Sequence, residues 1–207
     1  MDTIAIIGEG ITEKYYIESL QGFSPFRILP QELGKKASSL KKLEDNIKKA
    51  ISDGYDKVYC LIDMDSKTEG LPKQAYQRLK SKYKVPIINK NKGINCTIKF
   101  IESERCTELW FLYHFTYITK KLQNYATLEK ELKKYRPKYE KTDKYFKSIG
   151  GDIHKDLTSM KDGKIGSLKN AIKNSKSSIK SRDSDGREHT YSELHILIEE
   201  LGILDHI

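Results

Sequence analysis

The chain has 207 residues and a formal net charge of +9, with 37% hydrophobic and 32% charged residues. This composition suits one soluble domain, or one domain with an appendage, and no apolar run reaches the roughly 18 residues of a membrane span. The sequence opens directly on a strand pattern, without a secretory signal. The three cysteines are scattered, which argues against a disulfide framework or a structural zinc site, so we expect a protein of the reducing cytoplasm.

The first half of the chain alternates between apolar runs and amphipathic segments. The apolar runs predict strands over residues 4–7, 26–29 and 58–62, with Pro30 stopping the second, and residues 85–88 and 97–101 are candidates for the remaining strand. Helices are expected over residues 12–20, 40–51 and 72–83, with Thr12 as the first N-cap and Pro72 in the first turn of the third. This order predicts an α/β fold with a mostly parallel, four-stranded sheet flanked by helices.

After about residue 103 the pattern becomes helical. Helical segments are expected over residues 109–115, 121–135, 138–149, 166–180 and 191–201, with a polar loop over 181–189. We therefore divide the chain into an α/β domain over residues 1–103 and a helical extension over residues 104–207 packed on it, or two halves of one continuous domain.

Acidic residues follow two of the predicted strands, at the point where each strand ends. Glu9 follows the first strand, between Gly8 and Gly10, and Asp63 and Asp65 follow the strand at 58–62. Because the carboxyl ends of parallel strands meet at one sheet edge, these three acids are expected to lie together. Crowded carboxylates repel one another unless a cation lies among them, and oxygen ligands suit Mg²⁺ or Mn²⁺. The pattern predicts a metal-dependent enzyme acting on phosphates, with Glu9, Asp63 and Asp65 as metal ligands and catalytic residues.

Each of these motifs also has a purely structural interpretation. Aspartate is frequent at strand ends because its side chain caps the following backbone, and a glutamate in a turn is commonly solvated. The segment GEG over residues 8–10 is not GxGxxG, and no GK[ST] follows it, so neither a dinucleotide site nor a P-loop is indicated.

Two further acids and one histidine have two interpretations each. Glu13 lies one turn past Glu9 and could serve a second metal or stabilise the first helical turn. Glu108 lies in an apolar helical segment, where it could complete a second metal site or form a salt bridge with a lysine. His114 lies about 600° further around that helix, so we expect a buried, hydrogen-bonded histidine rather than a shared ligand.

Positive charge is concentrated in the second half. Residues 120–182 hold sixteen lysines and two arginines against seven acids, an excess of +11. Such a segment is typical of contact with a polyanion, although lysines on the wet faces of helices give the same composition. Lys90, Lys92 and Lys99 follow the strand at 85–88 and are expected to reach substrate phosphates near the metal, unless they are simply solvated.

The two acidic motifs together resemble a known family. The segments IAIIGEG over residues 4–10 and VYCLIDMD over residues 58–65 are similar to the signature of the Toprim domain. The segments EGITEKYY over 9–16, CTELWFLYHF over 106–115, AIKNSK over 171–176 and TYSELHILIEEL over 190–201 resemble the RloB/AbiLii family across nearly the whole chain.

The resemblance implies a Toprim-like fold and an anti-phage, abortive-infection role beside an ABC/OLD-type ATPase. Related Toprim effectors are nucleases, some acting on tRNA, and small ones often form homodimers. The chain is thus expected to cleave RNA or DNA with Glu9, Asp63 and Asp65, helped by Glu13 and Glu108. A non-catalytic Toprim-fold sensor or binding module is the alternative. Nucleotidyl transfer is disfavoured because the sequence shows no zinc-ribbon cysteines and no second catalytic domain, and a response-regulator phosphoacceptor has no place for the segment 106–115.

Overall fold

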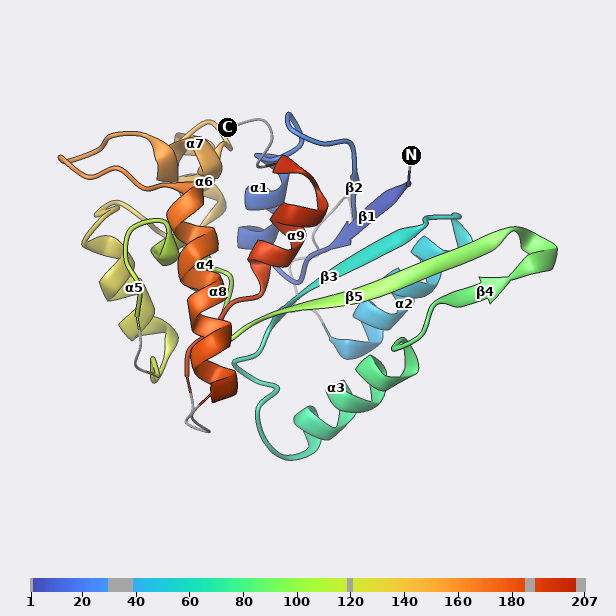
Figure 1. The fold of residues 1–207 in the computed structure, drawn as a ribbon. Coiled ribbons are helices and arrows are strands. Elements are labelled where there is room, and N and C mark those ends of the chain that lie inside the picture. Colours follow the sequence, from blue (N-terminus) through green and yellow to red (C-terminus); the bar gives the residue numbers. More distant parts are fainter. Residues whose placement is uncertain (1, 30–38, 119–120, 185–188, 204–207) are drawn as a thin grey trace.

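The computed structural model describes residues 2–29, 39–118, 121–184 and 189–203 of the chain. Its sheet has the strand order β2-β1-β3-β5-β4. The strands are β1 (Ile4–Ile7), β2 (Arg27–Leu29), β3 (Lys57–Asp63), β4 (Ile87–Asn89) and β5 (Ile94–Ser103). Strands β2, β1, β3 and β5 are parallel, whereas β4 is antiparallel to β5. The α/β prediction is confirmed, with five strands in place of the four expected (Figure 1).

Helices follow the strands in the first half and fill the second half. The helices are α1 (Ile11–Glu18), α2 (Leu40–Ser52), α3 (Gly70–Lys82), the 3₁₀ helix η1 (Lys90–Lys92), α4 (Glu108–Tyr113), α5 (Tyr125–Lys133), α6 (Asp143–Ser148), α7 (Ile153–Thr158), α8 (Leu168–Ser184) and α9 (Leu194–Glu200). None of these helices is long and apolar enough to cross a membrane.

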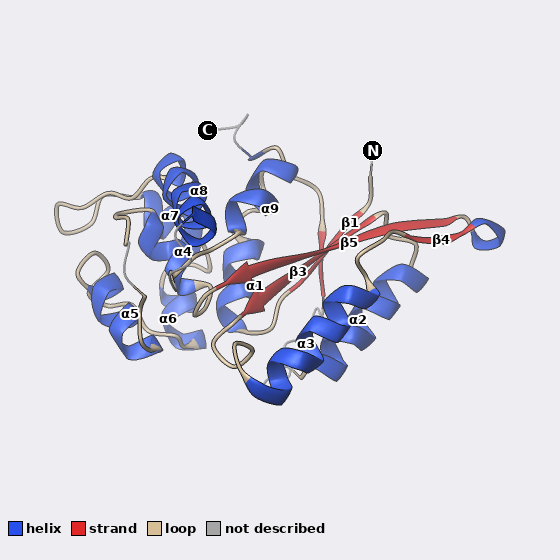
Figure 2. Ribbon diagram, turned by 60° about the horizontal axis from the view of Figure 1, so that its bottom comes forward, coloured by secondary structure: helices blue, strands red, loops and turns tan. Residues whose placement is uncertain are grey.

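Both faces of the sheet are buried, which explains the continuous apolar runs of its central strands. Along β3, Val58, Cys60 and Ile62 belong to the core beneath α2 and α3. Tyr59 and Leu61 point to the opposite face and join the core made with α1, α4 and α9. Figure 2 shows α2 and α3 side by side on one face of the sheet, with α9 on the other.

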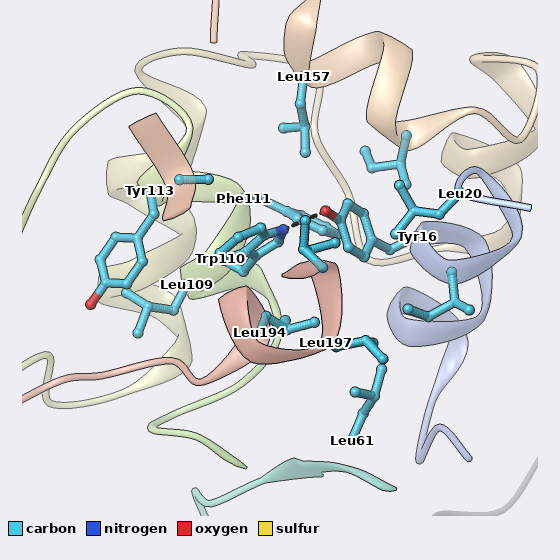
Figure 3. Close-up of a cluster of buried hydrophobic side chains, with 14 of the residues drawn as sticks. Tyr16, Leu20, Leu61, Leu109, Trp110, Phe111, Tyr113, Leu157, Leu194 and Leu197 are labelled. Carbon is cyan, nitrogen blue, oxygen red and sulfur yellow. Dashed lines mark hydrogen bonds between the residues drawn. The ribbon is translucent and has the colours of Figure 1, made fainter. Parts of the chain in front are cut away.

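The second half of the chain shares the larger core with the sheet. The Trp110 indole in α4 donates a hydrogen bond of 2.6 Å to the Tyr16 hydroxyl in α1, and both side chains are fully buried (Figure 3). Leu194 and Leu197 of α9 belong to the same cluster as Leu61 of β3. This packing fixes α4, and therefore its first residue, against the sheet.

Several local predictions differ from the structure. Gly10, not Thr12, is the N-cap of α1, so Thr12 lies inside the helix with its hydroxyl free for another partner. Residues 136–142 precede α6 as a non-helical segment where a helix from 138 was expected, and α7 was not expected at all. Helix α8 continues through Ser184, into the expected loop, of which residues 185–188 lie outside the described residues, as does Pro30.

Candidate active site

Carboxylates from four segments gather at the carboxyl edge of the sheet. Glu9 follows β1, and Asp63 is the last residue of β3. Because β1 and β3 are parallel neighbours, with Ile7 beside Cys60, both strands end at the same edge. Glu13 comes from the first turn of α1 and Glu108 from the first turn of α4. The sheet topology and the helix docking thus bring together residues that are up to a hundred positions apart in the chain.

Asp63 is anchored by the start of α4. Its Oδ1 accepts hydrogen bonds from the Thr107 backbone N–H at 3.0 Å and from the Thr107 hydroxyl at 3.3 Å. Burial, followed by the negative charges of Glu13 and Glu108, raises the pKa of Asp63 well above its ordinary value. The Asp63 carboxylate is therefore held in one orientation, and the charges closest to it are mainly negative.

Glu13 is the least satisfied acid of the group. It is 1% exposed, and neither of its carboxylate oxygens has a hydrogen-bond partner. Burial raises its pKa and the charge of Glu108 adds to that effect, while Lys141 and the nearby Thr107 hydroxyl oppose it. A buried carboxylate without a donor is costly, so this side chain indicates a position built for a partner outside the chain.

The two glycines around Glu9 make room for Glu13. A Cβ on Gly8 would lie 2.9 Å from the Cβ of Glu13, and a Cβ on Gly10 would lie 2.9 Å from its Oε2. Both distances are shorter than a van der Waals contact, so any larger residue would push Glu13 away. The GEG turn is thus explained by the close approach of α1 to the end of β1.

Glu108, in contrast, is fully satisfied. Its carboxylate accepts hydrogen bonds from the Thr12 hydroxyl at 2.9 Å and the Tyr139 hydroxyl at 3.0 Å, and it lies 3.1 Å from Lys141 Nζ. Although burial disfavours its charge, Lys141 and the hydrogen bonds hold the pKa of Glu108 below its usual value. Of the two interpretations offered by the sequence, the salt bridge with a lysine is the one observed.

Lys141 is the cation that several acids share. Burial disfavours its charge, but Glu108, Glu13 and Asp63 together hold its pKa above the ordinary value. Its side chain is 33% exposed. Lys141 also lines a cavity of about 270 Å³ together with Asp65, Cys106 and Tyr125, so the shared ammonium group faces both the acids and an opening.

Glu9 pairs with a second lysine. Lys67 Nζ lies 3.0 Å from Glu9 Oε2 and donates a 2.7 Å hydrogen bond to the backbone carbonyl of Asp63. Burial raises the pKa of Glu9, and Lys67 partly offsets that effect. The end of β1 and the end of β3 are therefore joined through one ammonium group.

Asp65 lies at the border of this group rather than inside it. Its side chain is exposed and lines the 270 Å³ cavity that it shares with Lys141. Its backbone N–H donates to the Arg105 carbonyl at 3.2 Å, which continues the pairing of this segment with the chain beyond β5. Asp65 is accessible to a ligand in this cavity, whereas Asp63 is mostly covered.

The three lysines expected near the metal do not lie there. Lys90 and Lys92 form the turn of the β4–β5 hairpin, at the end of the sheet far from α4–α9 (Figure 1). Because β5 runs nine residue steps from Ile94 to Ser103 beside Asp63, that turn is about 30 Å from the acids at ~3.3 Å per step. Lys99 forms an ion pair with Glu200 of α9. Their expected role at the metal is thus wrong.

His114 is confirmed as a buried, hydrogen-bonded residue. It is fully buried, and its Nδ1 lies 3.0 Å from the Trp110 carbonyl. Burial lowers the pKa of His114 to about 3, so the ring is neutral at physiological pH. The three cysteines are buried and free, and burial raises the pKa of the Cys106 thiol, which excludes it as a thiolate nucleophile at neutral pH.

The carboxylates can be tested for their fit to a metal ion. Among the described residues, no group of three or more His, Cys, Asp or Glu side chains is already arranged to hold one. Lys67 already pairs with Glu9, and Lys141 already pairs with Glu108. Yet the carboxylate oxygens of Glu13 have no hydrogen-bond partner, and the pKa of Asp63 is raised. The two lysines therefore do not balance the negative charge of these buried carboxylates. Carboxylate oxygens are ligands of the kind that hard divalent cations take, and Glu9, Glu13 and Asp63 would be the residues to hold one once Lys67 has left Glu9.

Five contributors to this site were missed from sequence: Thr12, Lys67, Thr107, Tyr139 and Lys141. Lys141 and Tyr139 come from the segment 136–142, where a helix had been expected. Lys67 is one of 38 basic residues, and its pairing depends on the turn that follows Asp63. The one usable signal was Pro137, which disfavours helix at residue 136 and predicts an extended segment there.

The fold and the site define a class: α/β proteins with buried carboxylates at the carboxyl edge of a mostly parallel sheet. A family model for RloB-like proteins matches residues 4–201, nearly the whole chain. The chain belongs to the RloB-like protein family. No curated protein and no solved structure matches it.

Proposed function

We propose that this protein is a Mg²⁺- or Mn²⁺-dependent nuclease with a Toprim-like catalytic site. The observation that carries the proposal is Glu13, a fully buried carboxylate without a hydrogen-bond donor beside the strongly perturbed Asp63. Carboxylates with perturbed pKa values at the carboxyl edge of a parallel sheet are candidates for a functional site. A bound divalent cation would polarise the scissile phosphate and activate a water molecule.

The residues of the chain divide into roles around that cation. Glu9, Glu13 and Asp63 would supply oxygen ligands, and Thr107 orients Asp63 through two hydrogen bonds. Asp65 lines the accessible cavity, where it could bind metal or hold the attacking water. Lys141 places a positive charge on the same cavity, where a substrate phosphate could bind. Glu9 could accept the proton of the water, since burial raises its pKa above the ordinary value.

The proposed substrate is supported by the charge of the second half of the chain, and the proposed biological setting is supported by the family. The excess of +11 over residues 120–182 suits the backbone of RNA or DNA, and this segment supplies Lys141 itself. Membership of the RloB-like family supports a role in anti-phage abortive infection, in the cytoplasm, with an ABC/OLD-type ATPase as partner. We propose RNA, with tRNA among the candidates, or DNA as substrate, and a homodimer as the functional form.

Cleavage assays test this proposal. Purified protein is incubated with total cellular RNA and with plasmid DNA, with Mg²⁺, Mn²⁺ or EDTA. We expect metal-dependent cleavage by the wild type and by Asp45→Asn, a change at an exposed acid in α2, and none by Asp63→Asn. Equal activity of Asp63→Asn and wild type would contradict the proposal, as would cleavage that persists in EDTA.

A second candidate is a non-catalytic sensor or binding module. Lys67 and Lys141 neutralise two of the four acids without any metal, and no ready metal group is found in the described part of the chain. Such a module would bind nucleic acid or the ATPase equally well with and without EDTA, and Asp63→Asn would leave that binding unchanged.

A further inference from the structure

We propose that Lys67 is a built-in counter-ion that occupies the cation position between Glu9 and the end of β3, so that a divalent cation binds only by displacing it. This inference deepens the proposed function and rests on it, since it concerns the same carboxylates. It assigns to Lys67 the control of metal affinity, a role separate from contact with substrate.

The surroundings of the Lys67 ammonium group resemble those of a bound cation. Nζ lies 3.0 Å from a carboxylate oxygen of Glu9 and 2.7 Å from the Asp63 carbonyl. A carboxylate and a backbone carbonyl are oxygen donors of the kind that hard divalent cations take. Lys67 as a whole is only 8% exposed, an unusual position for a lysine unless it is paired. The ammonium group thus stands where a metal ion would need to be.

Lys67 and a metal ion cannot share this position. An ammonium group and a divalent cation bound to the same carboxylate would repel each other at close range in a poorly solvated site. The side chain can leave without moving the sheet, because Lys67 lies in the turn between β3 and α3, where Asp65, Ser66 and Glu69 are exposed. Displacement therefore requires a rotation of one side chain into solvent.

Lys141 does not have this role. Its partner Glu108 keeps hydrogen bonds from Thr12 and Tyr139 whether or not Lys141 stays, and Lys141 already borders the open cavity. Glu9, in contrast, receives its salt bridge from Lys67. Loss of Lys67 frees a carboxylate for metal, whereas loss of Lys141 removes a cation that is shared among three acids.

Metal affinity in a matched set of variants tests the inference. Mn²⁺ binding is measured by the loss of the free-ion electron paramagnetic resonance signal, for wild type, Lys67→Gln, Lys67→Arg and Lys57→Gln. Lys57→Gln is the matched control, because it removes the same charge at the start of β3, about 20 Å away at ~3.3 Å per residue. We expect Lys67→Gln to bind Mn²⁺ about tenfold or more tightly than wild type, because a nearby like charge is gone. The Mn²⁺ affinities of Lys67→Arg and Lys57→Gln should stay within about twofold of the wild-type affinity, because both variants keep a positive charge next to Glu9.

A second measurement uses the unmodified protein and remains informative if Lys67→Gln fails to fold. Acetylation of individual lysines by acetic anhydride is followed by mass spectrometry, with and without saturating Mg²⁺. We expect the labelling of Lys67 to rise several-fold with Mg²⁺, while that of Lys57 is unchanged.

Three outcomes are distinguishable. Equal Mn²⁺ affinity of wild type and Lys67→Gln, or Lys67 labelling that Mg²⁺ leaves unchanged although the metal binds, would overturn the role of Lys67 and leave the metal site standing. Absence of Mn²⁺ binding in every variant would instead overturn the proposed metal-dependent function itself.

Discussion

Glu13 and Glu108 are equally buried acids at one sheet edge, and the structure gives them opposite effects on stability. Glu13 lacks any hydrogen-bond donor, whereas Glu108 has two hydroxyl donors and a lysine. We predict that Glu13→Gln stabilises the metal-free protein at pH 8 and that Glu108→Gln destabilises it. Replacing glutamate by glutamine would then raise the free energy of unfolding at position 13 and lower it at position 108.

The magnitude follows from the cost of an unpaired buried polar group, about 1–3 kcal/mol and more for a charged one. Removing the charge of Glu13 should therefore stabilise by about 1–3 kcal/mol, or about 2–4 °C in Tm for each kcal/mol in a chain of this size. Removing the charge of Glu108 should cost a similar ~1–3 kcal/mol, because its charge-assisted hydrogen bonds weaken. Both changes preserve the shape of the side chain.

The pH dependence of Glu13→Gln follows from the direction of the pKa shift. The folded-state pKa of Glu13 is raised above its ordinary value of 4.5, so the folded protein holds this proton more tightly than the unfolded chain. Its destabilising effect is absent below pH 4.5 and grows as the pH rises towards the folded-state pKa. The difference between wild type and Glu13→Gln should therefore be small at pH 4 and larger at pH 8.

Urea unfolding in EDTA at these two pH values measures both variants against wild type. Lower stability of Glu13→Gln than of wild type at pH 8 would refute the reasoning, because it would mean that the Glu13 carboxylate has a partner. Higher stability of Glu108→Gln would likewise contradict the assignment of Lys141 as its counter-ion.

Three further predictions concern packing and charge. Gly8→Ala should lower stability by about 1–3 kcal/mol, since its new Cβ would meet Glu13 at 2.9 Å, and Gly22→Ala, with open space around it, is the control in thermal unfolding. Tyr16→Phe should cost about 1 kcal/mol in urea unfolding, because the buried Trp110 N–H loses its 2.6 Å acceptor; an unchanged stability would mean that a water replaces the hydroxyl. Nucleic-acid cleavage should fall steeply as NaCl is raised from 50 to 200 mM, and a salt-independent rate would argue against phosphate contacts by residues 120–182.

The sheet edge could be predicted from sequence because its signals are local. Fully apolar runs such as residues 58–62 predict buried parallel strands, and an acid directly after such a run must lie at the carboxyl edge. The positions of Glu9 and Asp63 followed from these two rules. The direction of β4 did not, although the segment NKNKG over residues 89–93, with Gly93 at φ 64°, has the composition of a tight hairpin turn.

The counter-ions could not be predicted because they depend on tertiary contacts. Lys141 reaches Glu108 from a segment that Arg136 ties down through hydrogen bonds to the carbonyls of Asp156, Leu157 and Ser159. A lysine in a basic, polar stretch carries no local mark of such a partner. The interpretation of Glu13 stayed open for the same reason, because its lack of donors is a property of the folded surroundings.

An Mn²⁺-soaked crystal tests the central claim most directly, through the anomalous scattering of the metal. We predict an anomalous peak at coordination distance, roughly 2.0–2.6 Å, from carboxylate oxygens of Glu9, Glu13 and Asp63, with Lys67 rotated away from Glu9. A crystal in which Mn²⁺ binds elsewhere, or in which Lys67 keeps its contact with Glu9 at saturating Mn²⁺, would contradict it.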